Sequence, residues 1–243
     1  MKSRPAAAEA RNLGHRAATT RATAKEDSYG KRSKACRGSQ VAMTSNQSWA
    51  RMLPLDSSRL VLRRFSRTDV QAFLAYRNDP EVARFQGWDS FSLAEATAFV
   101  ARQETQPVAS PGQWLQIAIV LKQTGQLVGD CALKIHLADA RQATIGITLC
   151  RSSQGQGLAT EALTALLDFV FLEAGLHRVQ ADTDPENLTA RKLLERLGMR
   201  QEAHCRQSLW FKGRRADECF YAILRHAWQQ RRPNAPFPAV ASK

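Results

Sequence analysis

The sequence has no long hydrophobic run, although 44% of its 243 residues are hydrophobic. No stretch reaches the roughly 18 consecutive apolar residues that a membrane-spanning helix needs. The most apolar helical segment, residues 163–172, is interrupted by Asp168, and this pattern indicates a helix of a protein core. We therefore expect a soluble protein that makes no membrane contact.

Paired cysteines are also missing. The chain has five cysteines, and they lie far apart: Cys36, Cys131, Cys150, Cys205 and Cys219. An odd number without short paired spacing disfavours a disulfide framework and a zinc site, so we expect no bound metal. Unpaired thiols suit a reducing compartment, which predicts a cytoplasmic protein.

Acidic residues are scarce at the N-terminal end. The formal net charge is +13, and residues 1–50 account for +7 of it, because they carry ten Lys and Arg against three Asp and Glu. The rest of the chain carries +6. This distribution is weak evidence for a nucleic-acid-binding fold, and we expect contact with nucleic acid or the ribosome only through the basic leader.

The leader, residues 1–50, contains few large apolar side chains and is rich in Ala, Arg, Ser, Thr and Lys. Such a segment buries too little surface to offset its ordering entropy, so it is predicted to be disordered. Three explanations stay open: a nucleic-acid-binding arm, a transit-like leader, or a translation start assigned too early, with Met43 and Met52 as later starts. The folded domain is predicted at 51–230, followed by a flexible basic tail at 231–243.

Hydrophobic periodicity predicts one domain of strands and helices. Apolar runs bounded by turn residues predict strands at 59–65, 114–121, 127–136, 143–149, 177–182, 200–206 and 218–224. Helical spacing predicts helices at 70–76, from 92 onward, at 160–174 and at 189–197. Ser66 and Ser92 each stand three residues before an acid, which indicates capping boxes. The order of elements lacks a doubly wound rhythm and predicts an α/β (α+β) domain with a mixed sheet.

The run Gln154-Gly-Gln-Gly-Leu-Ala-Thr160 lies between a predicted strand and the long predicted helix. Gly155 and Gly157 allow a positive φ and a close approach of the backbone to a ligand. The N-terminus of the helix points N–H groups at this turn, which makes an anion pocket suited to phosphate or pyrophosphate. Thr160 adds a hydroxyl donor. A glycine turn that merely begins a helix is the alternative.

Two nucleotide-binding motifs do not fit this run. A Walker loop needs a Lys after its last glycine, and a dinucleotide fingerprint needs Gly or Ala at the place of Thr160. The run Gln154 to Ala159 does match Q/R-x-x-G-x-G/A, the acetyl-CoA pyrophosphate loop of the GNAT acetyltransferases.

Further blocks follow in the order and spacing of that family, so that the resemblance covers residues from about 55 to 228. The blocks are 59–63, 78–82, 157–162, Asn187 and 193–198, and they are similar to the branch of ribosomal-protein alanine N-acetyltransferases. The resemblance implies a central, mostly antiparallel sheet with a V-shaped splay, flanked by helices. It also implies an acyltransferase that uses acetyl-CoA as co-substrate and needs no metal.

The resemblance assigns cofactor contacts as well. It places the pantetheine arm along 147–151, the pyrophosphate on the backbone amides of 154–160, and Asn187 beside the thioester as a catalytic residue. The implied contacts are Leu149, Arg151, Gln154, Gly155, Gln156, Gly157, Leu158, Ala159, Thr160 and Asn187. Two departures remove hydroxyl groups: the family's Ser falls at Ala190, and its Tyr proton donor falls at Leu194.

The acceptor is expected to be a primary amine that attacks the thioester directly in a ternary complex. An α-amine with a pKa of about 7.7–8.0 is partly neutral at pH 7, whereas a lysine amine near about 10.4 is scarcely so. A chain without an obvious base therefore favours a protein or peptide N-terminal α-amine. The alternatives are a small-molecule N-acetyltransferase, acting on an aminoglycoside or amino-acid-like amine, and a non-catalytic acetyl-CoA-, RNA- or ribosome-binding module.

Glu202 is the first candidate for the catalytic base, because a Glu near this place recurs in the family branch. His204, Asp182 and Asp184 are further candidates, and each also fits a solvent-facing position or a turn. Cys150 fits a core or edge-strand thiol better than an acyl-carrying nucleophile.

In the family, the first helices and the last hairpin border the acceptor groove. Trp88 and Trp210 are therefore expected to pack an acceptor side chain, and Asp217 to hold its ammonium, with Asp89 and Glu218 as alternatives. Core-capping aromatics and a solvated loop explain these residues equally well. The protein is expected to be a monomer or a homodimer.

Overall fold

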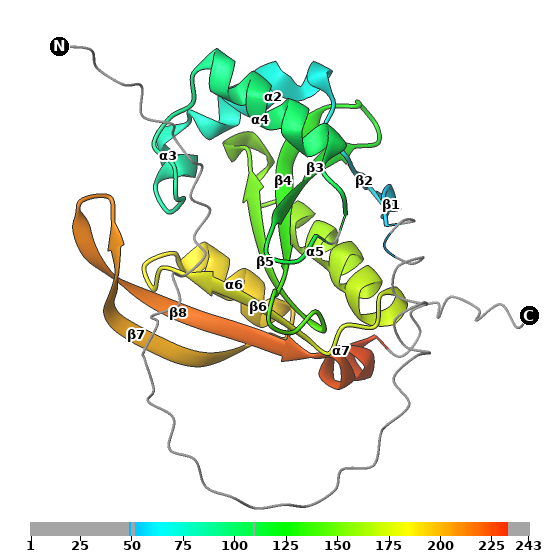
Figure 1. Cartoon of the computed structure of the whole chain (residues 1–243), viewed down its shortest axis with the longest axis vertical. Coiled ribbons are helices and arrows are strands. Elements are labelled where there is room, and N and C mark those ends of the chain that lie inside the picture. Colours follow the sequence, from blue (N-terminus) through cyan, green and yellow to red (C-terminus); the bar gives the residue numbers. More distant parts are fainter. Residues whose placement is uncertain (1–48, 50–51, 109, 233–243) are drawn as a thin grey trace, which may run out of the picture.

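The computed structural model describes Trp49 and residues 52–108 and 110–232, and these residues fold around one central sheet (Figure 1). The predicted leader 1–50 and the predicted tail 231–243 lie almost entirely outside the described residues. Within the described part, no helix is long and apolar enough to cross a membrane.

Eight strands form the sheet, in the spatial order β1-β2-β3-β4-β5-β6-β8-β7. They are β1 (Leu55–Asp56), β2 (Leu60–Arg63), β3 (Trp114–Leu121), β4 (Leu127–Ile135), β5 (Gln142–Leu149), β6 (Arg178–Thr183), β7 (Arg200–Phe211) and β8 (Arg214–Leu224). Neighbouring strands are antiparallel except β5 and β6, which run parallel. The prediction of a mixed, mostly antiparallel sheet is confirmed.

Helices cover both faces of the sheet: α2 (Val70–Arg77), α3 (Pro80–Ala83), α4 (Leu93–Thr105), α5 (Leu158–Asp168), α6 (Leu188–Arg196) and α7 (Arg225–Arg231). Short 3-10 turns precede α2 (Arg67–Asp69) and α5 (Arg151–Ser153). Capping boxes at Ser66 and Ser92 begin the first 3-10 turn and α4, as their spacing predicts. The predicted helix 160–174 begins earlier, at Leu158, and ends in a π-helical turn (Phe169–Glu173).

Two hydrophobic cores lie on opposite faces of the sheet. On one face, Phe73 of α2 and Phe99 of α4 pack with Ala118 and Val120 of β3. On the other face, α5, α6 and α7 pack with Ile117 and its neighbours. Successive side chains of a strand point to opposite faces, so β3 contributes to both cores. The centre of the sheet is therefore buried on both sides.

The sheet splits between β5 and β6. The two strands pair only where Gln142, Ala143 and Thr144 lie opposite Arg178, Val179 and Gln180. Beyond these positions β5 continues to Leu149 and β6 to Thr183 without pairing. Their second halves diverge into the V shape that the family resemblance implies, and the backbone edges inside the V are open to a ligand.

The hairpin of β7 and β8 is longer than predicted. The sequence predicted strands at 200–206 and 218–224, but β7 runs to Phe211 and β8 begins at Arg214. Most side chains of β7 are exposed on both faces, so the segment has no apolar alternation that would reveal it. A bulge in the middle of β7 also interrupts its register with β8.

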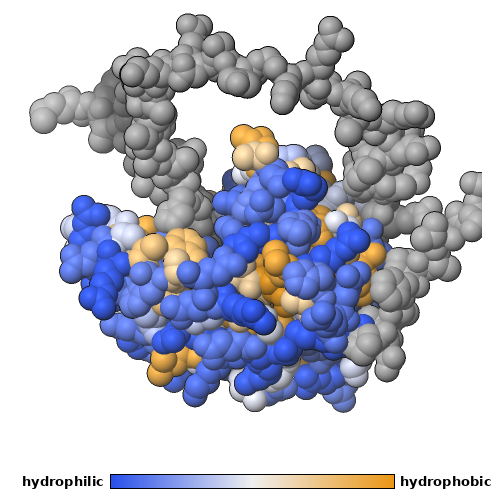
Figure 2. All heavy atoms as spheres, turned by 90° about the horizontal axis from the view of Figure 1, so that it is seen from below, coloured by the Kyte–Doolittle hydropathy of each residue, from blue (hydrophilic) through white to orange (hydrophobic). Residues whose placement is uncertain are grey.

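The visible surface is mainly hydrophilic, with apolar side chains in small separate groups (Figure 2). Among the described residues, the exposed large hydrophobic side chains are Leu93, Leu137, Leu188 and Trp210. Trp210 is the one tryptophan in this group, although all five tryptophans of the chain are described.

Candidate active site

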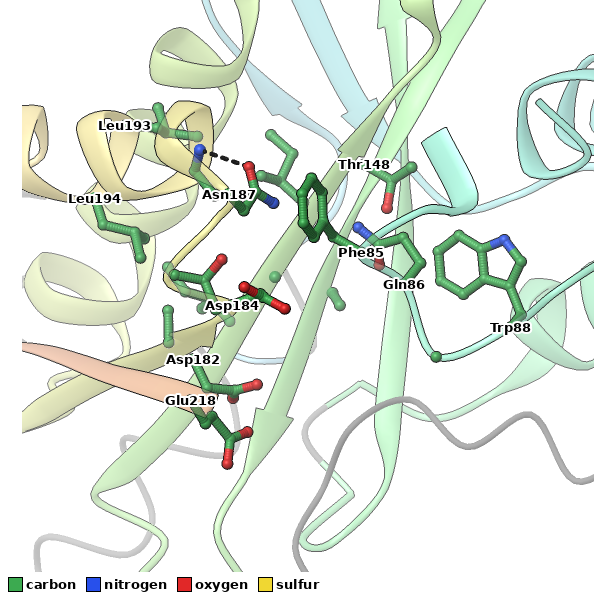
Figure 3. A pocket seen from close by; sticks show the side chains of 18 of the residues that line it. Phe85, Gln86, Trp88, Thr148, Asp182, Asp184, Asn187, Leu193, Leu194 and Glu218 are labelled. Carbon is green, nitrogen blue, oxygen red and sulfur yellow. Dashed lines mark hydrogen bonds between the residues drawn. The ribbon is translucent and has the colours of Figure 1, made fainter. Parts of the chain in front are cut away.

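A cavity opens at the splay between β5 and β6 (Figure 3). Its lining comes from five parts of the chain: the end of α2 with the loop before α4, strands β3 to β5, α5, the region from β6 to α6, and the β7–β8 hairpin. Segments that lie far apart in the sequence therefore meet where the sheet divides.

The glycine turn that was expected to hold the cofactor, residues 154–160, joins β5 and its 3-10 turn to α5, and we call it the cofactor turn. Its residues are not among those that line the cavity. Gly155 and Gly157 have φ values of +75° and +77°, a conformation that strains residues with a Cβ. Because α5 begins at Leu158, the first N–H groups of the helix point into the turn. Within the described chain, no acceptor takes a hydrogen bond from the N–H groups of residues 155–160. The turn thus presents donors and the positive end of a helix dipole to an anion.

Arg59 braces the cofactor turn. Its Nη1 donates to the carbonyl oxygen of Gln156 at 3.0 Å, and its Nε donates to Glu161 Oε2 at 2.7 Å. Glu161 Oε1 also accepts from the Arg59 N–H at 2.6 Å and from Ser57 Oγ at 2.7 Å. Burial raises the pKa of Glu161, but these hydrogen bonds outweigh burial and bring the pKa below its usual value. The charged carboxylate therefore ties the first turn of α5 to the start of β2.

Two further arginines lie near the turn. Arg196 of α6 donates to Thr160 Oγ1 at 3.4 Å, and Arg151 is exposed in the 3-10 turn that leads into residues 154–160. Gln154 is exposed, and its Nε2 donates to the carbonyl oxygen of Leu149 at 3.1 Å. The rim of the turn is therefore positively charged, while Gln154 fastens the turn to β5.

The backbone of β5 presents a free edge to the splay. The Cys150 N–H donates to the Val128 carbonyl at 2.8 Å, which makes Leu149 a non-hydrogen-bonded position opposite β4. The N–H groups of Leu149 and, by the same alternation, of Ile147 therefore point away from β4 and toward β6. Because β6 has diverged at this level, these N–H groups face the splay.

Small residues form the floor of the cavity beside this edge. Gln116 of β3 pairs with Ala132 of β4, and Ala132 pairs with Gly146 of β5, so the three residues share one face of the sheet. Gln116 is only 2% exposed, and its Oε1 takes no hydrogen bond from the described residues. This buried amide oxygen is therefore an acceptor without a partner among the described residues.

Three carboxylates line the side of the cavity beyond the splay, and we call them the acidic wall: Asp182 at the end of β6, Asp184 in the next turn, and Glu218 of β8 (Figure 3). Asp184 Oδ1 accepts from the Glu186 N–H at 2.8 Å, as expected of a residue that begins a turn. The described residues contain no group of His, Cys, Asp or Glu placed to hold a metal ion. The acidic wall offers carboxyl oxygens that suit an organic cation, and Arg214 Nη2 lies 4.0 Å from Asp184 Oδ2 at its edge.

The opposite wall is built on Arg77. Asp130 accepts from Arg77 Nη2 at 2.8 and 2.7 Å and from the Tyr76 hydroxyl at 2.6 Å. The guanidinium carbon of Arg77 lies 3.8 Å from the ring centroid of Trp88, whose Nε1 donates to the Arg77 carbonyl at 3.1 Å. Burial, followed by the charge of Asp130, raises the pKa of Tyr76 well above its usual value, so the hydroxyl stays protonated. These contacts hold Trp88 at the cavity, where it was expected.

Comparison with known proteins identifies the family. The family model described as "Acetyltransferase (GNAT) domain" matches residues 59–200, more than half of the chain. The chain belongs to this family. It is a GNAT N-acetyltransferase, as the resemblance in its sequence predicted.

Curated relatives and solved structures agree with this assignment. An uncharacterized N-acetyltransferase, p20 of Bacillus licheniformis, is 29% identical over 178 residues, which are 73% of this chain and 99% of that protein. The ribosomal protein uS5-alanine N-acetyltransferase of Escherichia coli is 31% identical, but over only 35% of this chain and 43% of that protein.

Among solved structures, a GNAT acetyltransferase from Bacillus anthracis has a TM-score of 0.65 at 25% identity, over 72% of this chain and 99% of that chain. The spermidine N-acetyltransferase from Vibrio cholerae, solved in complex with CoA and spermine, shares the fold. Its TM-score is 0.61 at 22% identity, over 70% of this chain and 98% of that chain.

Helix α6 brings Asn187, Ala190 and Leu194 to the cavity of this GNAT domain. Asn187 Oδ1 caps the helix by accepting from the Ala190 N–H at 3.1 Å (Figure 3). The positions at which the family resemblance puts Ser and Tyr thus line the cavity with a methyl and an isobutyl group. Neither side chain can donate a proton.

Glu202, the first candidate for the base, does not line the cavity. It lies on β7, the outermost strand, and accepts from Arg178 Nη1 at 2.7 Å. The hydrogen bond from Arg178 lowers the pKa of Glu202, which weakens it as a base. His204, also on β7, does not line the cavity either. Glu202 and His204 thus lie away from the cavity, whereas the other two candidates, Asp182 and Asp184, line it.

Trp210 does not meet the expectation of an acceptor contact. Its side chain is 65% exposed, while its neighbours Leu209 and Phe211 line the cavity. Successive residues of a strand point to opposite faces, so the side chain between two cavity residues is directed to solvent.

Asp217 lines the cavity, but its carboxylate is already engaged. Oδ1 accepts from the Gln207 N–H at 2.9 Å, and Oδ2 lies 2.8 Å from His204 Nε2. These two contacts, Gln207 first, lower the pKa of Asp217. Gln207 has a φ of +48° in the bulge of β7. Asp217 therefore holds the bulge in place, a role that its position in the sequence did not reveal.

Proposed function

We propose that this GNAT domain transfers the acetyl group of acetyl-CoA to a primary amine in a ternary complex. One observation carries the proposal: the cavity at the open splay of β5 and β6 is lined by the acidic wall and by residues 145–148 of β5, the strand that leads into the cofactor turn. An arm laid along the free edge of β5 would end beside an amine held by the carboxylates. Proximity of this kind lowers the barrier of a two-substrate reaction, because both reactants are already oriented.

The residues of the cofactor side suit acetyl-CoA, which supplies an acetyl group activated as a thioester. The N–H groups of residues 155–160 suit its pyrophosphate, with Arg151 at the rim. The free edge of β5 at Ile147 and Leu149 suits the amide groups of the pantetheine arm, much as an edge strand binds an extended peptide. Asn187 borders the same arm from α6.

Proton handling falls to the acidic wall in this proposal. Its carboxylates hold the acceptor ammonium, and one of them takes the proton that the amine must lose before it attacks. The Leu149 N–H is oriented to stabilise the oxyanion of the tetrahedral intermediate. Leu194 provides no proton for the departing sulfur, but a thiol with a pKa of about 8.5 leaves readily as thiolate. The missing hydroxyl groups therefore do not prevent turnover.

The acceptor that we favour is a protein or peptide N-terminal α-amine. The pKa of an α-amine is lower than that of a lysine side chain. The carboxylates of the acidic wall can therefore deprotonate it, and no stronger base is needed. Gln116 lines the cavity and its Oε1 has no partner among the described residues, which would suit an N–H group next to the terminal amine of a peptide. The uS5-alanine N-acetyltransferase of E. coli carries an activity of this class in its name.

A small polycationic amine is the second candidate. Three carboxylates lie together in one wall, and an acceptor that carries a second positive charge would suit such a cluster. The related fold from Vibrio cholerae is named as a spermidine N-acetyltransferase.

Release of free thiol from acetyl-CoA by the full chain would separate these acceptors. The panel contains peptides with N-terminal Ala or Ser, the same peptides with a blocked N-terminus and an internal lysine, polyamines and aminoglycosides. We expect the free N-terminal peptides to give the highest kcat/KM. Higher values for polyamines or internal lysines would overturn the acceptor class. Tight binding of acetyl-CoA without thiol release for any acceptor would favour a non-catalytic module.

A further inference from the structure

The tip of the β7–β8 hairpin is fastened to the end of α3 and to the loop between α3 and α4. Lys212 Nζ donates to the carbonyl oxygens of Ala83 and Trp88, both at 2.9 Å, and lies 3.1 Å from Asp89 Oδ1. An ammonium group has three N–H donors, and here each has an acceptor. We call this set of contacts the clasp.

The backbone of the hairpin tip does not explain why a lysine stands there. Lys212 and Gly213 form a two-residue connection with φ values of +45° and +79°. Positive φ at both positions is typical of the turn that favours Asn-Gly, because Asn and Gly adopt it most readily. A lysine is strained in this backbone conformation. The contacts of its ammonium group stabilise the hairpin tip and offset that strain.

The clasp joins two walls of the cavity. On the hairpin side, Leu209 and Phe211 line the cavity just before the tip. On the loop side, Phe85 and Trp88 line it, and Trp88 is itself held by its contacts with Arg77. The hairpin in Figure 1 is the orange pair of arrows whose tip reaches toward α3. Lys212 thus attaches a protruding hairpin to a rigid part of the domain, across the acceptor side of the cavity.

We propose that Lys212 determines acceptor size by keeping this side of the cavity closed. An acceptor that continues as a bulky chain beyond its amine must pass between the two walls or separate them. Separation requires that the ammonium leave three acceptors at once. With the clasp closed, short acceptors fit beneath the hairpin, and long ones compete with the clasp. This inference rests on the proposed function, because it assumes that the acceptor occupies this side.

The decisive variant is Lys212→Asn. Asn tolerates a positive φ, so the hairpin turn is retained, but its side chain is too short to reach the loop. We expect the ratio of kcat/KM for a long peptide to that for a tripeptide with the same N-terminus to rise about tenfold. The KM for acetyl-CoA should stay unchanged, because the cofactor turn lies on the other side of the splay.

Arg215→Asn is the matched control. It removes the same charge from the same hairpin, but Arg215 faces Trp210 at the outer surface, 5.8 Å from its ring centroid, and takes no part in the clasp. We expect this variant to leave the acceptor ratio within about twofold of the wild type. If Lys212→Asn does not fold, Lys212→Gly provides a second variant that also accepts the backbone conformation.

Amide hydrogen exchange tests the clasp without any acceptor. Residues 84–91 and 209–214 should both exchange faster in Lys212→Asn and remain unchanged in Arg215→Asn. Unchanged exchange in both segments would show that no clasp holds them and would overturn the proposal. Faster exchange with an unchanged acceptor ratio would also overturn it, because the clasp would then be structural only. If no acceptor is acetylated at all, the proposed function fails, and exchange alone decides whether the clasp exists.

Discussion

The proposed cofactor-binding segment and the proposed acceptor side of the cavity differ in what they are made of. The cofactor-binding segment offers mainly backbone groups, and it is one continuous stretch, the end of β5 and the start of α5. The acceptor side consists of side chains from the loop before α4, from β3 and β4, from β6, and from the hairpin. N–H groups are present whatever the side chains are, whereas a wall of side chains changes with each substitution.

This difference explains how one fold serves relatives that are named for different acceptors. The E. coli relative is named for an alanine of a ribosomal protein, and the Vibrio fold neighbour for spermidine. A glycine turn before a helix needs few residue types, because backbone N–H groups make its contacts with an anion. The acceptor side can vary without loss of the fold, so its chemistry must be established from side chains in place.

The largest expected effect is on the cofactor side. Gly157→Val places a β-branched side chain at a φ of +77°. The added Cβ would lie 3.6 Å from Arg59 Nη2. We expect kcat/KM for acetyl-CoA to fall about 100-fold, because displacing the turn by even 1 Å misaligns its N–H groups. Steady-state kinetics and calorimetric titration with acetyl-CoA would measure this loss.

Gly125→Val is the control for that variant. Gly125 has a φ of +69° in the turn between β3 and β4, and a Cβ there meets no atom within 4 Å. It brings a similar backbone strain at a distance from the cavity. Equal losses of acetyl-CoA binding in both variants would contradict a specific role of the cofactor turn.

A smaller effect is expected on the acceptor side. Asp182→Asn removes one negative charge from the acidic wall, so we expect the KM for a cationic acceptor to rise about tenfold and the KM for acetyl-CoA to stay constant. The effect should shrink as salt is added, because the remaining attraction is partly screened. Asp139→Asn, in the exposed turn before β5 and paired with Arg141, is the control. A rise in the KM for acetyl-CoA instead would show that the two sides are not separate.

The smallest effect is expected for Glu202→Gln. Since Glu202 does not line the cavity, we expect kcat at neutral pH to stay within about twofold of the wild type. The exposed pair with Arg178 stabilises the fold by no more than about 1 kcal/mol.

The pH dependence of that contribution follows from the lowered pKa of Glu202. The carboxylate is more acidic in the folded protein, so the stabilisation is complete above the pKa of the unfolded chain and is lost as the pH falls through the folded value. Urea unfolding at neutral and acidic pH should therefore show a difference between variant and wild type that disappears in acid. A hundredfold loss of kcat in Glu202→Gln would restore this residue as the base.

The sequence was informative where local rules determine the structure. The capping boxes at Ser66 and Ser92 depend on spacings of three residues, and the glycine turn depends on adjacent residues. The end of β5 that faces the splay could be located in the sequence, because the glycine turn 154–160 follows shortly after it. For these features, neighbours in the chain are also the partners in space.

The acceptor side could not be predicted in the same way, because its contacts join residues far apart in the chain. Arg77 meets Asp130 across two elements, and no local pattern marks either residue. The sequence could not show that Glu202 and Trp210 lie outside the cavity, because β7 is bulged and exposed on both faces, so its alternation does not distinguish the cavity from solvent. The role of Lys212 could not be predicted from the sequence. Two of its three acceptors are backbone carbonyls, which every residue has, so no residue type marks them.

The narrow junction of β5 and β6 links ligand binding to the stability of the protein. The two halves of the sheet are joined there by three residue pairs. A molecule seated in the gap bridges the halves and leaves when they unfold, so binding adds directly to the free energy of unfolding. At a concentration of 100 times Kd, that addition is about 2.7 kcal/mol. A rise in melting temperature therefore serves as a gauge of cofactor binding that needs no acceptor and no turnover.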